Sequence, residues 1–347
     1  MSEAIGPQPD DLPVHWLPGP ERHGVTLLAR QVAVAAGAPI VRGQEVPGWL
    51  HGRPVHLHFS TGLFHSPEAA RDVVDAWAAR TRLSLTLHDV PQPAEGPRWG
   101  RRSAVYCHVV ARSSAWAVNS RWEATLAAAA MPRASRDPEV IPLPVVPGPR
   151  STGPTRAVGA GSAVLPTPAP RRAPDGWIGV VGWVYPDKGH EEAIELALAM
   201  RSEGRALGVA ALGGVAAGHD GLADELARLA GSLGVEWHVT GYLDDDALAR
   251  AMHEVTVPVA AHRHPSASGS VNSWVAAGRR PLLREHPSTV ELDDLRPGAY
   301  RVRGLDAWPA EVALALDDPA RTWLSPGYRP PHTLDDVVQA YRSWWAL

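Results

Sequence analysis

Apolar and polar positions along the chain follow two periods. The alternating segment Leu83–His88 and the apolar run Trp177–Val181 have the length of strands, and apolar residues at helical spacing follow each of them. Strands that alternate with helices are typical of parallel, doubly wound α/β sheets. The pattern predicts strands at 12–17, 54–59, 83–88, 115–118, 177–181, 207–212, 236–240, 255–260 and 281–283, and helices at 25–36, 67–80, 104–111, 121–130, 189–201, 222–233, 244–252, 270–277 and 333–345.

The alternation stops between residues 142 and 174, where prolines occur among Gly, Ala, Thr and Arg without apolar periodicity. This composition is typical of a linker. A length of 347 residues also fits two domains, each with its own core. We therefore expect an N-terminal Rossmann-like domain at 1–146, a Pro/Gly-rich linker at 147–175, a C-terminal Rossmann-like domain at 176–330 and a closing helix at 331–347.

Composition narrows the class of protein. A hydrophobic content of 45% and a charged content of 20% are ordinary for a soluble protein, and a net charge of −4 argues against a general nucleic-acid binder. The single cysteine, Cys107, excludes an internal disulfide. The first residues lack the pattern of a signal peptide, and no apolar run is long enough to span a membrane. We expect a cytoplasmic protein.

Lys188 is the only lysine among 33 lysine and arginine residues. It lies where a predicted strand meets a predicted helix, which opens near Lys188 with Asp187 as its expected cap. The N-terminus of a helix favours anions, and a compact ammonium there suits a phosphate. The alternative is a solvated first-turn lysine without a role.

A second loop leads from a strand into a helix and is rich in small polar residues. It contains Arg263, Ser268, Gly269 and Ser270, with Asn272 in the first turn of the helix. We predict that this loop also binds an anion, although the two serines could simply cap the helix. Two such helix starts in one domain favour a diphosphate.

Other polar positions are candidates in the first half. Gly24 opens a predicted helix and would let a ligand approach the backbone. His88 ends a strand and suits a polar contact to a sugar or phosphate. A zinc site that uses His56, His58, His65 and His88 is an alternative. We interpret Asp244–Asp246 as a helix start, because acidic residues there favour the helix dipole.

Six segments occur in an order that resembles a known family, the retaining glycosyltransferases of family 4 with the GT-B fold. Glu291 falls where that family has a Pro-Glu glutamate. The six segments are Thr86–Asp89, Val118–Ser120, Val140–Pro144, Gly182–Gly189, Val239–Leu243 and Ala276–Pro281.

The resemblance implies two Rossmann-like domains that face each other across a cleft, with a nucleotide-diphosphate sugar held mainly by the second. It implies Lys188 on the donor diphosphate, His88 near the transferred sugar, the amides of the serine loop on phosphate, and neither a metal nor another cofactor. The acceptor is left open as a small molecule, a glycan or a lipid-linked compound.

Two departures from the family affect the expected site. Trp183 stands where the family has a diphosphate-binding arginine. The family's Glu-x7-Glu pair falls at Pro265 and Ser273, so both carboxylates are absent. Arg263, Arg279, Arg280 or Asn272 are candidate replacements.

Two classes of function follow from these residues. The first is an enzyme that moves a hexose from a nucleotide sugar to an acceptor. The second is a catalytically silent GT-B protein that acts as a sugar-nucleotide sensor or an assembly partner. Peripheral membrane contact is a further hypothesis, based on Arg98, Arg101, Arg102 and Arg112, and its alternative is a solvated basic helix face.

Overall fold

The computed structural model describes residues 12–132, 134, 136–146, 164–165, 175–266 and 268–347. Most of the expected linker at 147–175 lies outside these residues. The chain forms two compact units. The first unit comprises Met1–Pro144 and His332–Leu347, and the second comprises Val145–Pro331.

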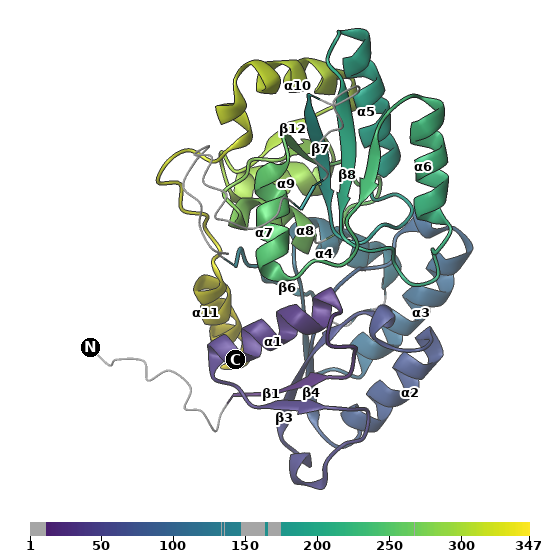
Figure 1. The fold of residues 1–347 in the computed structure, drawn as a ribbon. Coiled ribbons are helices and arrows are strands. Elements are labelled where there is room, and N and C mark those ends of the chain that lie inside the picture. Colours follow the sequence, from purple (N-terminus) through teal and green to yellow (C-terminus); the bar gives the residue numbers. More distant parts are fainter. Residues whose placement is uncertain (1–11, 133, 135, 147–163, 166–174, 267) are drawn as a thin grey trace. The chain divides into compact units, whose positions relative to one another are not determined.

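The first unit alternates strands and helices and takes its last helix from the end of the chain (Figure 1). Three short 3₁₀ helices, η2 to η4, interrupt the alternation. The elements are β1 (Val14–Leu17), α1 (Gly24–Ala36), β2 (Ile40–Arg42), η2 (Gly48–Leu50), β3 (Pro54–Phe59), η3 (Thr61–Leu63), α2 (Pro67–Ala78), β4 (Arg82–Leu87), η4 (Pro93–Glu95), α3 (Pro97–Ala111), β5 (Ala115–Val118), α4 (Arg121–Ala130), β6 (Glu139–Val140) and α11 (Leu334–Trp345).

The second unit repeats the same alternation within one continuous segment (Figure 1). Its elements are β7 (Gly176–Val181), α5 (His190–Ser202), β8 (Leu207–Leu212), α6 (Leu222–Ser232), β9 (Trp237–Val239), α7 (Asp245–Glu254), β10 (Val257–Ala260), α8 (Gly269–Ala276), β11 (Leu282–Arg284), α9 (Pro287–Leu295), β12 (Arg301–Arg303), η5 (Leu305–Ala307), α10 (Trp308–Asp317) and η6 (Pro319–Thr322).

Each unit is built on a parallel sheet that reverses its strand order once. The first sheet has the order β2-β1-β3-β4-β5-β6, and the second has the order β12-β11-β10-β7-β8-β9. All the pairs between these strands are parallel. The reversal, or switch point, lies between β1 and β3 in the first sheet and between β7 and β10 in the second.

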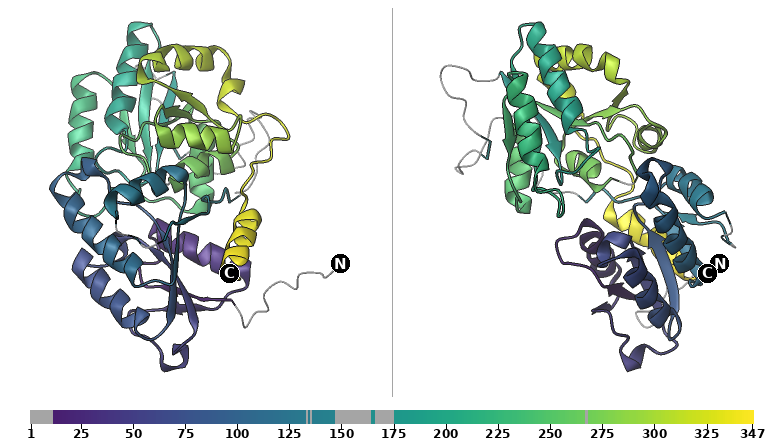
Figure 2. Two further views of the ribbon diagram at one scale, coloured as in Figure 1. Left: turned by 180° about the vertical axis from the view of Figure 1, so that it is seen from behind. Right: turned by 90° about the vertical axis from the view of Figure 1, so that its right-hand side faces the viewer.

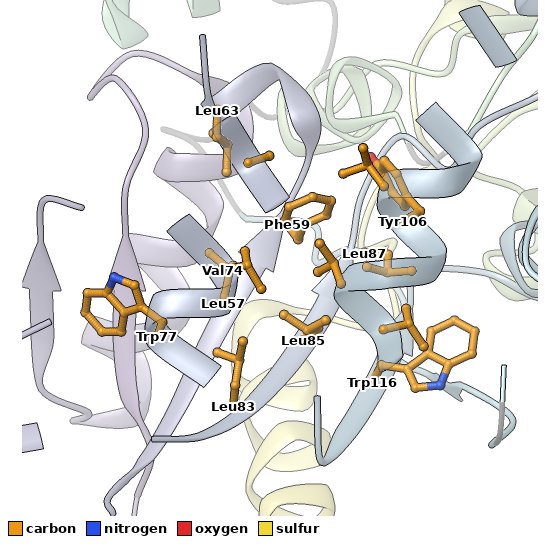
Figure 3. Close-up of a cluster of buried hydrophobic side chains, with 14 of the residues drawn as sticks. Leu57, Phe59, Leu63, Val74, Trp77, Leu83, Leu85, Leu87, Tyr106 and Trp116 are labelled. Carbon is orange, nitrogen blue, oxygen red and sulfur yellow. The ribbon is translucent and has the colours of Figure 1, made fainter. Parts of the chain in front are cut away.

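One face of the first sheet is apolar. Leu57 and Phe59 of β3 and Leu85 of β4 point to this face, where Val74 of α2 and Tyr106 of α3 cover them (Figure 3). Helix α2 packs against α3, and α3 against α4, along the same face (Figure 2). Burial of this cluster is the main stabilising contribution to the first unit.

The opposite face of the same sheet carries histidines, because side chains alternate between faces along a strand. His15, His56, His58 and His88 are buried there. Helix α11 covers this face: the Trp345 ring lies 5.2 Å from the ring of His15. The four side chains are neutral because burial lowers their pKa values, to about 3 for His15 and His88 and well below 6.5 for the other two.

The structure confirms the predicted α/β alternation and changes several bounds. Strands β2, β6 and β12 and helices α9 and α10 were not predicted. Helix α3 begins at Pro97 and not near residue 104. Helix α5 begins at His190, with Gly189 at the N-cap position, so the expected cap by Asp187 is wrong. Among the described residues, no helix is long and apolar enough to cross a membrane.

We expect the histidine face to make the first unit sensitive to acid. A folded-state pKa near 3 and an unfolded value of 6.5 favour the neutral form in the fold. The contribution of each neutral histidine to the free energy of unfolding is therefore fully present above pH 6.5, and it is lost as the pH falls toward 3. One such histidine costs about 2 kcal/mol at pH 5 relative to pH 7.

Replacement of His15 by leucine tests this expectation, since neither ring nitrogen of His15 has a hydrogen-bond partner among the described residues. Urea unfolding at pH 7 and pH 5 should show a loss on acidification about 2 kcal/mol smaller than in the wild type. The exposed His51→Leu variant is the control. An equal loss in all three proteins would contradict the expectation.

Candidate functional site

Lys188 and Ser270 meet at the switch point of the second sheet. Lys188 follows β7, and Ser270 is the second residue of α8, which follows β10. Lys188 Nζ donates a hydrogen bond of 2.8 Å to Ser270 Oγ, and the Ser268 and Ser270 hydroxyl oxygens lie 2.9 Å apart. Ligands of open α/β sheets bind outside the carboxyl ends of the strands at such a point. Three predicted site residues therefore meet where this topology places a ligand.

Gly189 allows the start of α5 to lie close to the switch point between β7 and β10. Its φ is 97°, and a Cβ atom there would lie 2.7 Å from the Cβ atom of Ala261, directly after β10. Only glycine fits this backbone conformation at this distance. Since α5 begins at His190 and α8 at Gly269, two helix N-termini open near the switch point. Both supply backbone N–H groups and a positive potential that favour an anion.

The ammonium group of Lys188 is buried. The side chain is 5% exposed, and its Nζ lies 5.5 Å from the ring centroid of Tyr185. Among the described residues, Lys188 forms no salt bridge with a carboxylate. Burial lowers the pKa of Lys188 from 10.5 to about 7. At neutral pH roughly half of the molecules carry the charge, and a bound anion would favour that charged form.

Arg263 joins the two loops instead of facing the lysine. Its guanidinium donates to Glu192 and Glu191, each at 2.6 Å, and lies 3.7 Å from Asp187. Its backbone N–H also donates to the Asp187 carbonyl. These contacts fix the loop after β10 against the loop after β7 and the first turn of α5. A direct contact of Arg263 with a donor stays a prediction.

The suggestion that Arg279 replaces a lost ligand group is wrong. Arg279 is 1% exposed, and it donates to the backbone carbonyls of Met252, Val255, Thr256 and Thr322. Its positive charge stabilises the end of α7 and the segment that follows it. Arg280 donates to the Tyr300 carbonyl.

Two other predicted donor contacts lie elsewhere in the second unit. The amide oxygen of Asn272, a buried residue of α8, lies 3.4 Å from Arg296 Nη1 and 3.5 Å from the Tyr300 hydroxyl. Glu291 is partly exposed in α9. The donor-binding roles of both residues stay predictions.

Sequence reasoning missed two histidines beside Lys188. His190 and His262 are buried, and the Nε2 atom of each has no hydrogen-bond partner among the described residues. Burial lowers both pKa values, and the charge of Lys188 lowers them further. The available signal was position, because His262 is the second residue after β10, at the carboxyl edge of the sheet.

His88 belongs to the first unit and is part of a buried polar network. Its Nε2 atom lies 3.0 Å from His58 Nδ1, and its carbonyl accepts a 2.6 Å hydrogen bond from the Tyr106 hydroxyl. Asn119 lies 3.4 Å from the other ring nitrogen, but its two amide hydrogens have shorter partners in Leu87 O and Glu123. The network fixes the ring of His88, whose catalytic role stays a prediction.

The remaining candidates in the first unit differ in their surroundings. Gly24 is the first residue of α1, and a Cβ atom there would meet no protein atom within 4 Å, so packing does not require glycine at this position, and its donor-binding role stays a prediction. Within the described ranges, no group of three or more His, Cys, Asp or Glu side chains is arranged to hold a metal ion, which includes the suggested histidine site.

The proposed basic face of α3 is largely paired with carboxylates. Arg101 forms a salt bridge with Glu68, Arg112 with Asp75, and Arg102 with both Asp89 and Glu95. Arg98 is exposed. Paired arginines contribute less to attraction by an anionic membrane, and membrane contact through this face stays a hypothesis.

Comparison with solved structures identifies similar folds. A chain of Anabaena Alr3699/HepE in complex with UDP-glucose has a TM-score of 0.64 and 14% identity, with 95% of this chain and 94% of that chain covered. An α,α-trehalose-phosphate synthase (UDP-forming) from Burkholderia xenovorans has a TM-score of 0.59 and 13% identity, with 84% and 72% covered. TarM has a TM-score of 0.55 and 8% identity, with 92% and 54% covered. No family model and no curated protein matches the sequence.

Identities this low show the fold alone. Two six-stranded parallel sheets with flanking helices, together with these neighbours, define the GT-B fold of glycosyltransferases. The predicted fold class is confirmed.

We expect replacement of Lys188 by methionine to stabilise the protein. The lowered pKa corresponds to a cost on the order of 4 kcal/mol at pH 7, and methionine fills a similar volume without a charge. The lost hydrogen bond to Ser270 offsets about 1 kcal/mol of the gain. Calorimetry at pH 7 should show a higher melting temperature.

The pH dependence of the stability distinguishes the removal of a buried charge in Lys188→Met from a change in packing alone. Because the folded pKa of Lys188 lies below its unfolded value, the wild type gains stability as the pH rises from 7 toward 10.5. The advantage of the variant should therefore shrink by pH 9. Arg228→Met, at an exposed position of α6, should change stability by less than about 0.5 kcal/mol. A Lys188→Met protein less stable than the wild type at pH 7 would overturn the interpretation.

Proposed function

We propose that this protein is a glycosyltransferase that moves a hexose from a nucleotide-diphosphate sugar to an acceptor, with retention, as a divergent relative of family 4. The contact between Lys188 and Ser270 at the switch point is the observation that carries the proposal. The neighbours add support, because HepE was solved with UDP-glucose and the synthase is named as UDP-forming.

The chemistry of such a transfer explains why a buried ammonium is useful. The bond between the sugar C1 and the diphosphate oxygen breaks, a bond from C1 to the acceptor oxygen forms, and the acceptor hydroxyl releases its proton. Negative charge develops on the leaving diphosphate, which can take up that proton. Lys188 and the N-termini of α5 and α8 are positioned to stabilise that charge. In this proposal they provide the stabilisation without a metal ion, and His88 contacts the transferred sugar.

A second candidate is a GT-B protein that binds a sugar nucleotide without turnover. Two observations favour it. The family's carboxylates are replaced by Pro265 and Ser273, and the guanidinium of Arg263 is bound by carboxylates of its own unit. The two candidates share the donor site and differ only in turnover.

A panel of UDP-, GDP- and ADP-sugars in a thermal-shift experiment tests the shared part. A donor at 100 times its dissociation constant adds about 2.7 kcal/mol of stability. Release of nucleotide from a stabilising donor, with an acceptor mixture present, favours the enzyme. Stabilisation without release in the presence of glycan, lipid-linked and small acceptors favours the silent protein, and no stabilisation by any donor contradicts both.

We expect the affinity for a stabilising nucleotide sugar to fall as the pH rises from 7 to 8.5. The free Lys188 has a pKa of about 7, and a bound diphosphate would raise it, so binding above pH 7 takes up a proton. The dissociation constant should rise by about tenfold over this interval, since one proton sets a limit of tenfold per pH unit. The nucleotide-sugar diphosphate keeps its own charge in this range.

Isothermal titration in buffers of different ionisation enthalpy measures both the affinity and the proton uptake. Lys188→Met should abolish binding at each pH, whereas Arg228→Met should retain the affinity and its slope. Wild-type affinity in Lys188→Met, or a flat pH profile in the wild type, would contradict the role assigned to the lysine.

A further inference from the structure

Large aromatic side chains are exposed beside the lysine site. Trp183 in the loop after β7 is 43% exposed, and Tyr242 in the loop after β9 is 55% exposed. Both belong to loops at the carboxyl edge of the second sheet. Exposed apolar rings that gather next to a polar pocket are typical of ligand contacts.

Gly214 shows that the two residues are neighbours. A Cβ atom at Gly214 would lie 3.1 Å from the Trp183 ring and 3.6 Å from the Tyr242 backbone nitrogen. The loops themselves are paired, because Val184 N–H donates to the Gly214 carbonyl at 2.9 Å and Val184 bridges to Val215. The Trp183 ring therefore lies against a fixed glycine backbone. We call Trp183 and Tyr242 the aromatic surface.

The aromatic surface lies next to Lys188 and Ser270. Lys188 Nζ would lie 3.2 Å from a Cβ atom at Gly182, the residue before Trp183. A Cβ atom at Gly213, the residue before Gly214, would lie 2.3 Å from the Gly182 carbonyl oxygen. Ser270 after β10, Lys188 after β7 and the aromatic surface on the loops after β7 and β9 therefore follow one another along the carboxyl edge of the sheet.

One polar side chain near the aromatic surface is already hydrogen-bonded within the protein. The Thr240 hydroxyl, which precedes Tyr242 by two residues, lies 2.9 Å from the Gly241 carbonyl oxygen and accepts a hydrogen bond from Gly213 N–H. The donor of this hydroxyl and one of its two lone pairs are therefore used, which leaves it at most one acceptor position for the polar edge of a ligand. A flat, uncharged ring that stacks is the ligand chemistry that the surface favours.

We propose that the aromatic surface stacks the nucleobase of a nucleoside diphosphate whose phosphates lie at Lys188 and Ser270. This inference rests on the proposed function and deepens it by stating how the donor nucleotide is selected. Stacking on an aromatic side chain tolerates every base, because each base has a π face. The choice of nucleotide thus depends more on the area of the base that stacks on the aromatic rings than on hydrogen bonds to the polar edge of the base.

Binding of UDP, GDP, ADP and inorganic pyrophosphate by isothermal titration tests the proposal. In the wild type, each nucleoside diphosphate should bind at least about tenfold more tightly than pyrophosphate, and the three should agree within about tenfold. Trp183→Ala should weaken the nucleoside diphosphates by about tenfold and leave pyrophosphate within about twofold. Trp183→Phe, which keeps an aromatic face, should retain most of the affinity.

Trp49→Ala is the matched control, because Trp49 of the first unit is 56% exposed. It should change none of the four affinities. An equal loss for pyrophosphate and the nucleoside diphosphates in Trp183→Ala would overturn the stacking role, and so would an unchanged affinity. A preference above about 100-fold for one base that survives Trp183→Ala would also overturn it. If pyrophosphate and the nucleotides all fail to bind the wild type, the proposed function itself is wrong.

Discussion

The burial of one ammonium group at the switch point is the constraint on which the site depends. Two of the buried cations in the second unit, Arg279 and Lys188, differ in how their N–H donors are satisfied. Arg279 uses its donors on backbone carbonyls around the end of α7. Lys188 has one described hydrogen-bond acceptor, Ser270 Oγ, for three N–H donors. A fold that only needed a cation there would satisfy it, as it does for Arg279.

The first unit is also built on a six-stranded parallel sheet, but its strand order differs from that of the second, and so does the chemistry of its two faces. Its sheet is apolar on the face that α2, α3 and α4 cover, and it carries histidines on the face that α11 covers. The Tyr341 hydroxyl lies 2.9 Å from Thr86 Oγ1, so the last helix of the chain contributes to the polar network of the first unit. Neutral imidazoles allow this face to be buried without carboxylate partners, and the cost is sensitivity to acid.

Two kinds of element were predictable from the sequence: strands that are buried on both faces, and helices whose apolar residues recur at helical spacing. Strands β7 and β8 are continuous apolar runs, as expected of parallel strands covered on both faces. Prediction failed where periodicity is short or absent: β2 and β12 have three residues each, and α3 begins with an arginine-rich turn. The start of α5 was misplaced because Gly189, which allows the approach to Ala261, acts through a tertiary contact.

The site was partly predictable for the same reason. Composition singled out Lys188, and local spacing singled out Ser268 and Ser270, since each precedes or opens a helix. The partners of Arg263 were not predictable, because Glu191 and Glu192 are more than 70 residues away along the chain. The sequence alone gives no sign that Arg263 is paired, whereas in the folded chain it forms salt bridges with three carboxylates.

The neutralisation of Arg263 changes how the site can attract a diphosphate. Arg263 and Arg284 are balanced against Asp187, Glu191 and Glu192, so these groups give no excess of positive charge around the pocket. In the proposed function, attraction of a diphosphate would then come from groups at contact distance, namely the Lys188 ammonium and the backbone N–H groups at the starts of α5 and α8. Salt screens buried contacts less than surface charges. In the proposed donor site, where Trp183 stands at the position of an arginine in family 4, binding would therefore depend on one desolvated charge and an uncharged ring instead of a cluster of cations.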